Sequence, residues 1–379
     1  MGACTSRHAN RSLQRSNEWK VDDVDPAMAN IAITSAQAGK LTAAATAKNV
    51  KLSDLALNCV TYSSFLRNDC LTGWEDGTIQ RLDWRLATTV ALNVWKPHSR
   101  AVNCVVVRDK LQMIYSCSRD TTVAITPVAD KPASETATIL RGHQSNVSTV
   151  AVDDAEQMLC SGGWDTQTIF WDLTTSHIAV KNTISLNVIT CSTWLPGEKI
   201  VAQGSEDLSV KFWDPRTPLR VPVQSLRGFV HFPLSIAADG EGTNTYLLTS
   251  SKGLNGVGCE ARIWDRRTGK QVIEYHGHQQ DTTACCFLPQ TVNSSGANIE
   301  NRLIPVTASK DGTVKIWNDA RLTPLAEAHA IGDKIMFTSM CRVNDSTILT
   351  STVGGQILAY SFDYNLRTLA LLRRQENTT

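Results

Sequence analysis

The sequence predicts an all-β fold, a seven-bladed β-propeller over residues 51–379, preceded by a disordered tail over residues 1–50. Two observations predict this fold class. First, a short unit recurs seven times, running from a Ser or Thr through a tight turn with Asp to β-rich residues that end in Trp-Asp. Second, the tail is polar and Ala-rich and lacks sustained apolar periodicity, so it has too little apolar surface to order itself.

The repeated unit has the period of a propeller blade. The clearest copies are SGGWDTQTIFWD (161–172), QGSEDLSVKFWD (203–214) and TASKDGTVKIWN (307–318), and weaker ones lie at 72–83, 116–127, 250–265 and 350–361. The Trp position recurs every 42 to 53 residues, at Leu82, Thr126, Trp171, Trp213, Trp264, Trp317 and Tyr360. Such a period is typical of four-stranded blades, which cover each other's faces when they pack in a ring.

Two units are longer than the others. Residues 253–258 lengthen the turn of the fifth unit, and a polar insertion at 291–301 lengthens the sixth, so we expect surface loops at both places. The outer strand of the seventh blade has two candidate sources. Residues 366–374 can supply it directly, or residues 41–50 can wrap round to supply it.

Composition argues against several classes of function. Lys and Arg number 37 against 36 Asp and Glu, so the chain lacks the basic footprint of a nucleic-acid-binding protein. No apolar run reaches the 18 or more residues of a membrane span. The eleven Cys include no C-x-x-C pair, which indicates reduced thiols in a cytosolic protein.

The repeats resemble a known family. The Trp-Asp endings, and the Gly-His pairs in Arg141-Gly142-His143 and His276-Gly277-His278, are similar to WD40 repeats over about residues 52–379. The second unit departs from the pattern with Thr126-Pro127, and the first and seventh lack the Trp. Residues 256–265, 274–278 and 285–289 (GVGCEARIWD, EYHGH and CCFLP) resemble WD-repeat proteins associated with cilia or flagella. That resemblance implies a non-enzymatic organiser of ciliary or flagellar protein trafficking.

Two sets of residues repeat at equivalent blade positions. They are His143, Ser161, Asp165 and Trp171, and then His278, Thr307, Asp311 and Trp317. Ser, His and Asp also form hydrolytic triads. A catalytic site needs no duplicate, however, so we expect two structural tetrads in which hydrogen bonds link Asp, His, hydroxyl and indole inside a blade. The sequence therefore predicts no catalytic residues.

No metal or nucleotide site is expected, and no cofactor. His276 and His278 alternate on opposite faces of an extended chain, and so do Cys285 and Cys286. Residues 253–258 (GLNGVG) lack the Lys-Ser/Thr ending of a phosphate loop. The predicted partners are other proteins and a membrane surface, with no nucleic acid and no small-molecule substrate.

Residues just before the turn Asp are candidates for binding protein partners, because they tend to lie on the rim of one face in WD40 propellers. The residues at this position are Glu75, Arg119, Trp164, Glu206 and Lys310, and the last four are the binding candidates. Trp and Arg are frequent interface hot spots, although Trp164 could instead pack on a neighbouring loop. Two Trp-Asp-x-Arg endings, with Arg216 and Arg267, resemble a motif that docks on a cullin ubiquitin ligase adaptor. The alternative is that each Arg only pairs with the nearby Asp.

The N-terminus carries a lipidation signal. Met1 to Ser6 match M-G-x-x-x-S, so Gly2 is a candidate for N-myristoylation and Cys4 for S-palmitoylation. Two acyl chains are what stable membrane attachment needs. The sequence therefore predicts a scaffold on the cytoplasmic face of a membrane, with a role in a cilium or flagellum. The alternatives are a substrate receptor of a cullin ubiquitin ligase and a soluble cytosolic scaffold.

Overall fold

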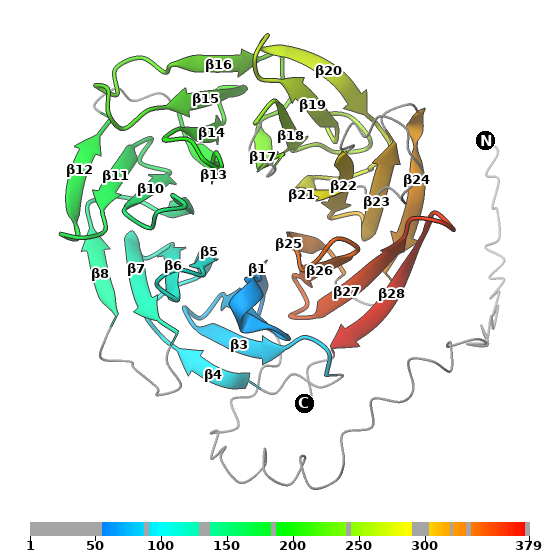
Figure 1. The fold of residues 1–379 in the computed structure, drawn as a ribbon, viewed down its shortest axis with the longest axis horizontal. Helices are drawn as coiled ribbons and strands as arrows, with labels where there is room; N and C mark the ends of the chain where they lie inside the picture. The colour runs from blue at the N-terminus through cyan, green and yellow to red at the C-terminus, as the bar shows by residue number, and fades with distance from the viewer. Residues whose placement is uncertain are drawn as a thin grey trace, which may run out of the picture. The chain divides into compact units, whose positions relative to one another are not determined.

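The computed structural model describes residues 55–86, 91–128, 137–182, 187–239, 244–289, 303–318, 321–330 and 335–375. Within these residues the chain forms seven four-stranded antiparallel sheets, arranged as blades around a ring (Figure 1). The predicted all-β, seven-bladed propeller is confirmed. The described part has one short 3-10 helix, η2 (Ser64–Leu66), and no described helix is long and apolar enough to cross a membrane.

Each blade is built from consecutive strands, with the first at the centre of the ring and the fourth at its edge (Figure 1). Blades 1 to 3 contain β1 (Leu57–Thr61), β2 (Asp69–Trp74), β3 (Ile79–Asp83), β4 (Ala91–Trp95), β5 (Val102–Arg108), β6 (Met113–Ser118), β7 (Thr122–Pro127), β8 (Thr138–Arg141), β9 (Val147–Val152), β10 (Met158–Gly163), β11 (Thr168–Asp172) and β12 (His177–Lys181). Blades 4 and 5 contain β13 (Ile189–Trp194), β14 (Val201–Ser205), β15 (Ser209–Trp213), β16 (Gln224–Arg227), β17 (Pro233–Ala238), β18 (Tyr246–Ser251), β19 (Ala261–Asp265) and β20 (Lys270–Tyr275). Blades 6 and 7 contain β21 (Thr282–Pro289), β22 (Leu303–Ser309), β23 (Thr313–Asn318), β24 (Arg321–His329), β25 (Phe337–Arg342), β26 (Thr347–Thr352), β27 (Ile357–Asp363) and β28 (Thr368–Gln375).

The third strand of every blade carries the residue predicted at the Trp position. These seven residues are all buried, at 2% exposure or less: Leu82, Thr126, Trp171, Trp213, Trp264, Trp317 and Tyr360. Side chains alternate between the two faces of a strand. In β11, Trp171 therefore packs toward blade 2, and Phe170 packs toward blade 4. The apolar core is divided accordingly into seven clusters, each lying between two neighbouring blades.

The ring closes between blades 7 and 1 without exchange of a strand. β28 pairs with β27, so the C-terminal segment supplies the outer strand of blade 7, which decides between the two predicted sources. Residues 41–50, the other source, lie outside the described residues. Leu57 and Trp74 of blade 1 pack with Leu349 and Ile357 of blade 7, and the Thr338 hydroxyl donates to the Leu57 carbonyl at 2.8 Å.

A ring of polar side chains joins the inner strands. The second residue of an inner strand donates to the first residue of the next blade's inner strand, as in Asn58 to the Val102 carbonyl at 3.0 Å. The other donors of this kind are Asn103, Ser148, Thr190, Thr283 and Thr338. In blade 5 the position is Leu234, which has no hydroxyl or amide to donate. Blade 5 is thus the one break among the described inner strands.

Candidate functional site

In blade 3 the predicted tetrad residues form one hydrogen-bonded chain. His143 Nδ1 lies 2.9 Å from Asp165 Oδ2, and His143 Nε2 lies 2.7 Å from Ser161 Oγ. Trp171 Nε1–H donates to the same Ser161 Oγ at 2.8 Å. A carboxylate accepts only, so Nδ1 carries the proton and Nε2 accepts from the hydroxyl. This chain connects the turn after β10 to the strands on either side of it.

Blade 6 repeats the chain with a Thr. His278 Nδ1 lies 3.2 Å from Asp311 Oδ2, His278 Nε2 lies 2.8 Å from Thr307 Oγ1, and Trp317 Nε1–H donates to Thr307 at 2.8 Å. Burial lowers the pKa of His278 below its ordinary value of 6.5, which keeps its ring neutral. Burial alone would raise the pKa of Asp311, but hydrogen bonds, the strongest from His278, lower it well below its ordinary value. The pair is therefore a neutral imidazole beside an ionised carboxylate.

Blade 2 contains a third, incomplete chain that the sequence analysis missed. His98 Nδ1 lies 3.2 Å from Asp120 Oδ2, and His98 Nε2 lies 2.9 Å from Ser116 Oγ. Thr126 replaces the Trp, and its buried hydroxyl has no partner within the described part of the chain. The sequence signal was weak because Pro97, not Gly, precedes His98 and no Trp-Asp follows. Only the Ser and Asp of SCSRD (116–120) match the repeat.

The tetrad hydroxyls are inaccessible. Ser161, Thr307 and Ser116 are each 0% exposed, and their histidines lie beneath the turns. A hydrolytic nucleophile must reach a substrate carbonyl. These three sets therefore have the geometry of structural links and offer no nucleophile to a bound substrate.

The candidate partner-binding residues occupy equivalent places in the structure. In every blade the turn between the second and third strands has one residue whose N–H donates to the carbonyl just before the inner strand, at 2.8–3.0 Å. These residues form what we call the turn ring: Glu75, Arg119, Trp164, Glu206, Lys252, Lys310 and Val353. Because all seven turns follow the second strand of an antiparallel blade, they lie on one face of the propeller.

The turn ring presents different chemistry in each blade. Trp164 is 54% exposed, so it is not covered by a neighbouring loop. Arg119 and Glu206 are exposed, whereas Lys310 Nζ pairs with Asp281 Oδ2 at 2.8 Å. Lys252 and Val353 are not recognisable as turn-ring residues in the sequence. The fifth unit has no turn Asp that would mark the position, and the seventh unit has Gly354 in place of the turn Asp.

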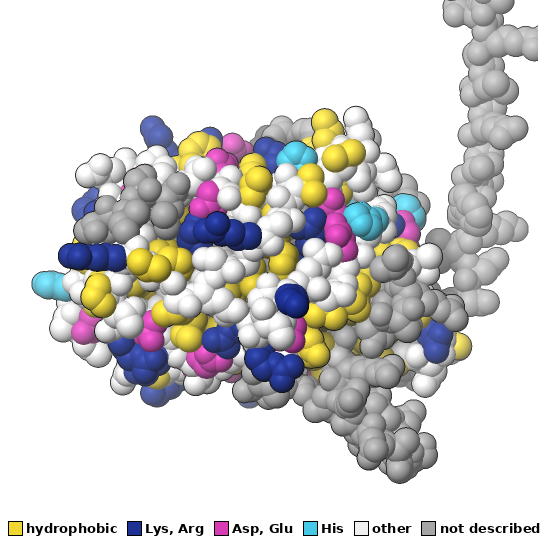
Figure 2. Space-filling view, turned by 90° about the horizontal axis from the view of Figure 1, so that it is seen from above, with side chains coloured by type: hydrophobic (Ala, Val, Ile, Leu, Met, Phe, Trp, Pro, Cys, Tyr) yellow, Lys and Arg dark blue, Asp and Glu magenta, His cyan; other side chains and the backbone are white. Residues whose placement is uncertain are grey.

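Exposed apolar side chains continue this surface over blades 3 to 5. Trp164, Leu208, Leu254 and Val257 are 54%, 39%, 65% and 61% exposed, and all four lie on turns between second and third strands. We call these four residues the apolar arc. The lengthened turn at 253–258 was predicted as a surface loop, and it supplies Leu254 and Val257. On the edge of the molecule seen in Figure 2, basic, acidic and apolar side chains are interspersed.

The two Trp-Asp-x-Arg arginines pair with the preceding aspartates. Arg216 Nη2 lies 2.7 Å from Asp214 Oδ2, and Arg267 Nη2 lies 3.6 Å from Asp265 Oδ2. Both Arg side chains stay largely exposed, at 66% and 81%. The pairing matches the simpler of the two predicted explanations, although the exposed guanidinium groups remain open to a partner. Gly2 and Cys4, the predicted lipidation sites, lie outside the described residues.

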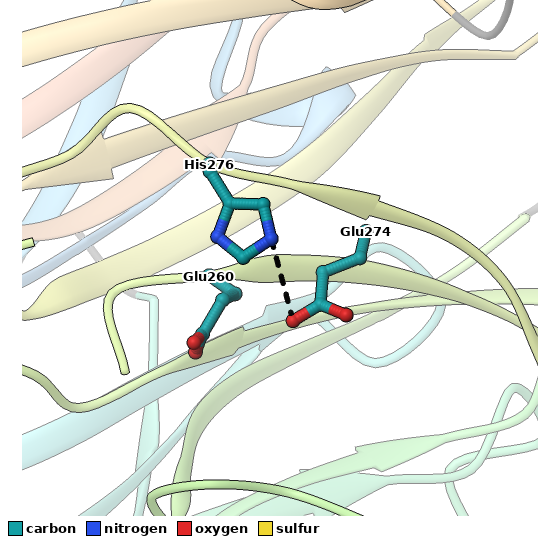
Figure 3. Close-up of side chains that lie close together, drawn as sticks. All are labelled: Glu260, Glu274 and His276. Atoms are coloured by element: carbon teal, nitrogen blue, oxygen red, sulfur yellow. Dashed lines mark ion pairs between the residues drawn. The ribbon is translucent and has the colours of Figure 1, made fainter. Parts of the chain in front are cut away.

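One group of side chains in the described part has the atoms to hold a metal ion. Glu260, Glu274 and His276 each place a ligand atom within 4.8 Å of the others (Figure 3). No metal site is predicted from the sequence, in which the nearest His to His276 is His278. The structure instead places His276 beside Glu260 and Glu274 on one face of the sheet.

Known proteins share the repeats. The family model "WD domain, G-beta repeat" matches residues 90–125, 134–172 and 269–318. The chain is similar to a "Ribosome biogenesis protein WDR12 homolog" of Oryza sativa subsp. japonica, with 25% identity covering 70% of this chain and 65% of the relative. It is also similar to "Pre-mRNA-processing factor 19" of Mus musculus, with 28% identity covering 39% of this chain and 29% of the relative. The chain thus spans less than two thirds of the length of these curated relatives.

The solved structures agree on the fold. "Structure of U3-55K" superimposes with a TM-score of 0.60 and 17% identity, over 73% of this chain and 82% of that one. At this identity the likeness concerns the fold alone. The seven observed sheets show a seven-bladed β-propeller, and three segments of it match the WD domain, G-beta repeat.

Proposed function

We propose that this chain is a non-enzymatic scaffold that binds other proteins through the turn-ring face of its propeller. The apolar arc carries this proposal, because large apolar side chains are exposed together on one face of a rigid ring. Leu254 and Val257 face each other across one turn, and exposed apolar side chains gathered on one face are typical of protein-binding sites. Trp164 supplies the rigid aromatic side chain that interface hot spots favour, and Arg119 lies on the adjacent blade.

Variants on opposite faces of the ring test this proposal. Tagged wild type, Trp164→Ala/Leu254→Ser and the control Leu366→Ala are to be purified from the same cells, with bound proteins quantified by mass spectrometry. Leu366 is 73% exposed on a turn between third and fourth strands, which lies on the other face. We expect the double variant to lose a set of partners that the control retains. Equal partner sets for all three proteins would contradict the proposal.

The finer proposal is that the scaffold is tethered to the cytoplasmic face of a membrane and organises ciliary or flagellar trafficking. The N-terminal M-G-x-x-x-S motif supports the tether, with myristate on Gly2 and palmitate on Cys4. The resemblance of residues 256–265, 274–278 and 285–289 to WD-repeat-containing protein 31 supports the ciliary role. We expect wild type to pellet with membranes, Cys4→Ala to bind weakly and Gly2→Ala to be soluble. A Gly2→Ala variant that fractionates like wild type would exclude this tether.

A second candidate is a scaffold for ribosome biogenesis or pre-mRNA processing. The names of the relatives support it, since the ribosome biogenesis protein covers 70% of this chain. Imaging of C-terminally tagged wild type beside Gly2→Ala separates the candidates. Membrane or ciliary signal that Gly2→Ala loses supports the tether, whereas nuclear signal unchanged in Gly2→Ala supports the second candidate.

The cullin ligase alternative has its own test. Arg216 and Arg267 are exposed enough to reach an adaptor. If the chain is a ligase substrate receptor, Arg216→Ala/Arg267→Ala should lose adaptor binding while keeping the partners of the turn-ring face. No adaptor binding by wild type would exclude this role.

A further inference from the structure

Blade 5 contains a buried carboxylate that nothing in the described structure neutralises. Glu260 lies just before β19 and is only 6% exposed, and its Oε2 atom has no hydrogen-bond partner among the described residues. A buried charge without a partner is strongly unfavourable. The residue at this position in blades 2 and 6 is Thr122 or Thr313, whose hydroxyl donates to the turn Asp.

The usual partners are missing because blade 5 has no tetrad. Phe229 occupies the place of the tetrad His, and it packs on Trp264 with ring centroids 4.9 Å apart. The lengthened turn replaces the tetrad Asp. Glu260 therefore has neither a tetrad His nor a turn Asp beside it, although both are present at this position in blades 2 and 6.

Two potential ligands lie on the same face of the sheet. Arg262 and Glu274 are cross-strand partners, and Glu260 and His276 occupy the next pair of positions toward the turn-ring face. Glu274 Oε1 lies 3.6 Å from His276 Nε2, and a carboxylate oxygen of Glu260 is within 4.8 Å of both ligand atoms (Figure 3). Ligands of a tetrahedral metal ion with bonds of about 2.0–2.1 Å lie roughly 3.3 Å apart. Glu260 therefore needs to approach the other two ligand atoms by no more than about 1.5 Å to complete such a set.

Charges around the group favour a cation. Arg262 is 3% exposed and donates to Glu274 Oε1 at 3.0 Å and to the Gly228 carbonyl at 2.7 Å. One guanidinium against two carboxylates leaves one negative charge uncompensated. Gln271 Nε2 donates to Glu274 Oε2 at 2.8 Å, so two residues outside the ligand set orient this carboxylate, as is common in metal sites. His276 is 60% exposed and leaves a path for an ion from solvent.

From this geometry we propose that Glu260, Glu274 and His276 bind a divalent transition-metal ion of the Zn²⁺ type. A neutral imidazole with two carboxylates is a suitable ligand set for such an ion. The imidazole favours a metal over a basic side chain from a partner, because a neutral imidazole nitrogen coordinates a metal but adds no charge for a Lys or Arg. This site would order the lengthened turn, which contributes Leu254 and Val257 to the apolar arc, and it is independent of the scaffold proposal.

Blade 6 provides a matched control. There Glu327 Oε1 lies 2.8 Å from His329 Nε2, and Lys315 Nζ pairs with Glu327 Oε2 at 2.6 Å. This arrangement repeats the Glu–His pair and the basic residue of blade 5. Thr313 stands across from His329, where blade 5 has Glu260. Only blade 5 therefore has the third ligand.

The test is competition of the full-length chain with a chromophoric chelator, using Zn²⁺ alone as the probe. We expect one ion per wild-type chain, at least about tenfold weaker binding in Glu260→Gln and in His276→Ala, and unchanged binding in His329→Ala. Co²⁺ bound in place of Zn²⁺ should show d–d bands without a thiolate charge-transfer band, which excludes the cysteines as ligands. Absence of saturable binding in wild type, or equal binding by Glu260→Gln, would overturn the proposal.

Thermal unfolding gives a second readout that also checks folding. Without metal, Glu260→Gln should melt at a higher temperature than wild type, because it removes an uncompensated buried charge. Added Zn²⁺ should raise the melting temperature of wild type and of His329→Ala, but not that of Glu260→Gln. If wild type melts at the same temperature with and without saturating Zn²⁺, the site is excluded. A basic partner residue would then be the remaining way to neutralise Glu260.

Discussion

Blades 3 and 5 hold the same four-stranded sheet with different chemistry. In blade 3, His143, Ser161 and Asp165 form a hydrogen-bonded chain that ends on Trp171. In blade 5 the places of the His and Asp are taken by Phe229 and a longer turn. Arg262 stacks over the Phe229 ring at 5.5 Å, so packing replaces the His–Asp end of the network, while Trp264 Nε1–H still donates to the Thr249 hydroxyl at 2.9 Å.

The comparison shows that a blade can be held together by a fully hydrogen-bonded polar network or by aromatic packing. A blade that keeps only part of the network leaves buried polar atoms without partners. Blade 5 keeps a buried carboxylate at Glu260, and blade 2 keeps a buried hydroxyl at Thr126 where the Trp is missing. Blade 5 also lacks the inner-strand donor, because Leu234 replaces it. Both buried groups lower the stability of the fold, because a buried polar atom without a partner loses its hydrogen bonds to water and gains none in the protein.

The largest expected effect comes from removing the packing that substitutes for the tetrad. Phe229→Ala should lower the free energy of unfolding by about 3–5 kcal/mol, because it leaves a cavity beside Trp264. Phe229→His should also destabilise, although it restores the residue of blade 3, since blade 5 has no Asp to accept from it. Denaturant unfolding measures both values, and wild-type stability in Phe229→His would show that the His suffices alone.

Removing Asp165, the charged residue of the blade 3 network, should lower the free energy of unfolding by less than the Phe229→Ala change. Asp165→Ala leaves the His143 Nδ1–H and the Gln144 N–H without an acceptor, so we expect a loss of about 3 kcal/mol. Glu206→Ala, an exposed change in the next blade's equivalent turn, should stay within about 0.5 kcal/mol. A loss in Asp165→Ala as small as that of the control would mean that the network adds no stability.

Acid should lower the free energy of unfolding, because it protonates the His and Asp side chains of the tetrads. The pKa of His278 is lowered by burial, so the unfolded state takes up its proton first and stability falls as pH drops below 6.5. The pKa of Asp165 is also lowered, because hydrogen bonds led by that from His143 outweigh burial, so a second loss follows below about pH 3.8. Unfolding followed at several pH values measures both, and Asp165→Ala should show a smaller second loss than wild type.

The two chains that contain a serine, the complete tetrad of blade 3 and the incomplete chain of blade 2, should differ in what their hydroxyl contributes to stability. Ser161→Ala leaves both the Trp171 indole N–H and His143 Nε2 without partners, at a cost of about 2 kcal/mol. Ser116→Ala leaves only His98 Nε2, at about 1 kcal/mol, because blade 2 has no Trp. Equal losses in parallel denaturation curves would show that the indole bond contributes nothing.

The smallest expected effect has the opposite sign. Thr126→Val removes the buried hydroxyl that has no partner among the described residues and keeps the shape of the side chain. We expect a gain of about 1 kcal/mol. A loss of stability on unfolding would indicate that the Thr126 hydroxyl has a bound water as its partner.

The sequence alone determined the number of blades, because the unit that marks each blade is local. It also named the residues of the two complete tetrads, although each His lies 22 or 33 residues from its Asp. The turn Asp and the Trp lie six residues apart in SGGWDTQTIFWD, so a single antiparallel hairpin brings them together. Trp164 was also identified, since its place next to the turn Asp is visible in one unit.

Only the tertiary structure decided which residues meet across long separations in the chain. His98 reaches Ser116 although the family signals around it are missing, and Lys252 joins the turn ring from a turn of irregular length. The ring closes where Thr338 donates to Leu57, which is 281 residues away in sequence. Glu260 and His276 likewise come together only through the register of β19 and β20, because cross-strand neighbours are set by hydrogen-bond pairing and not by spacing in the sequence.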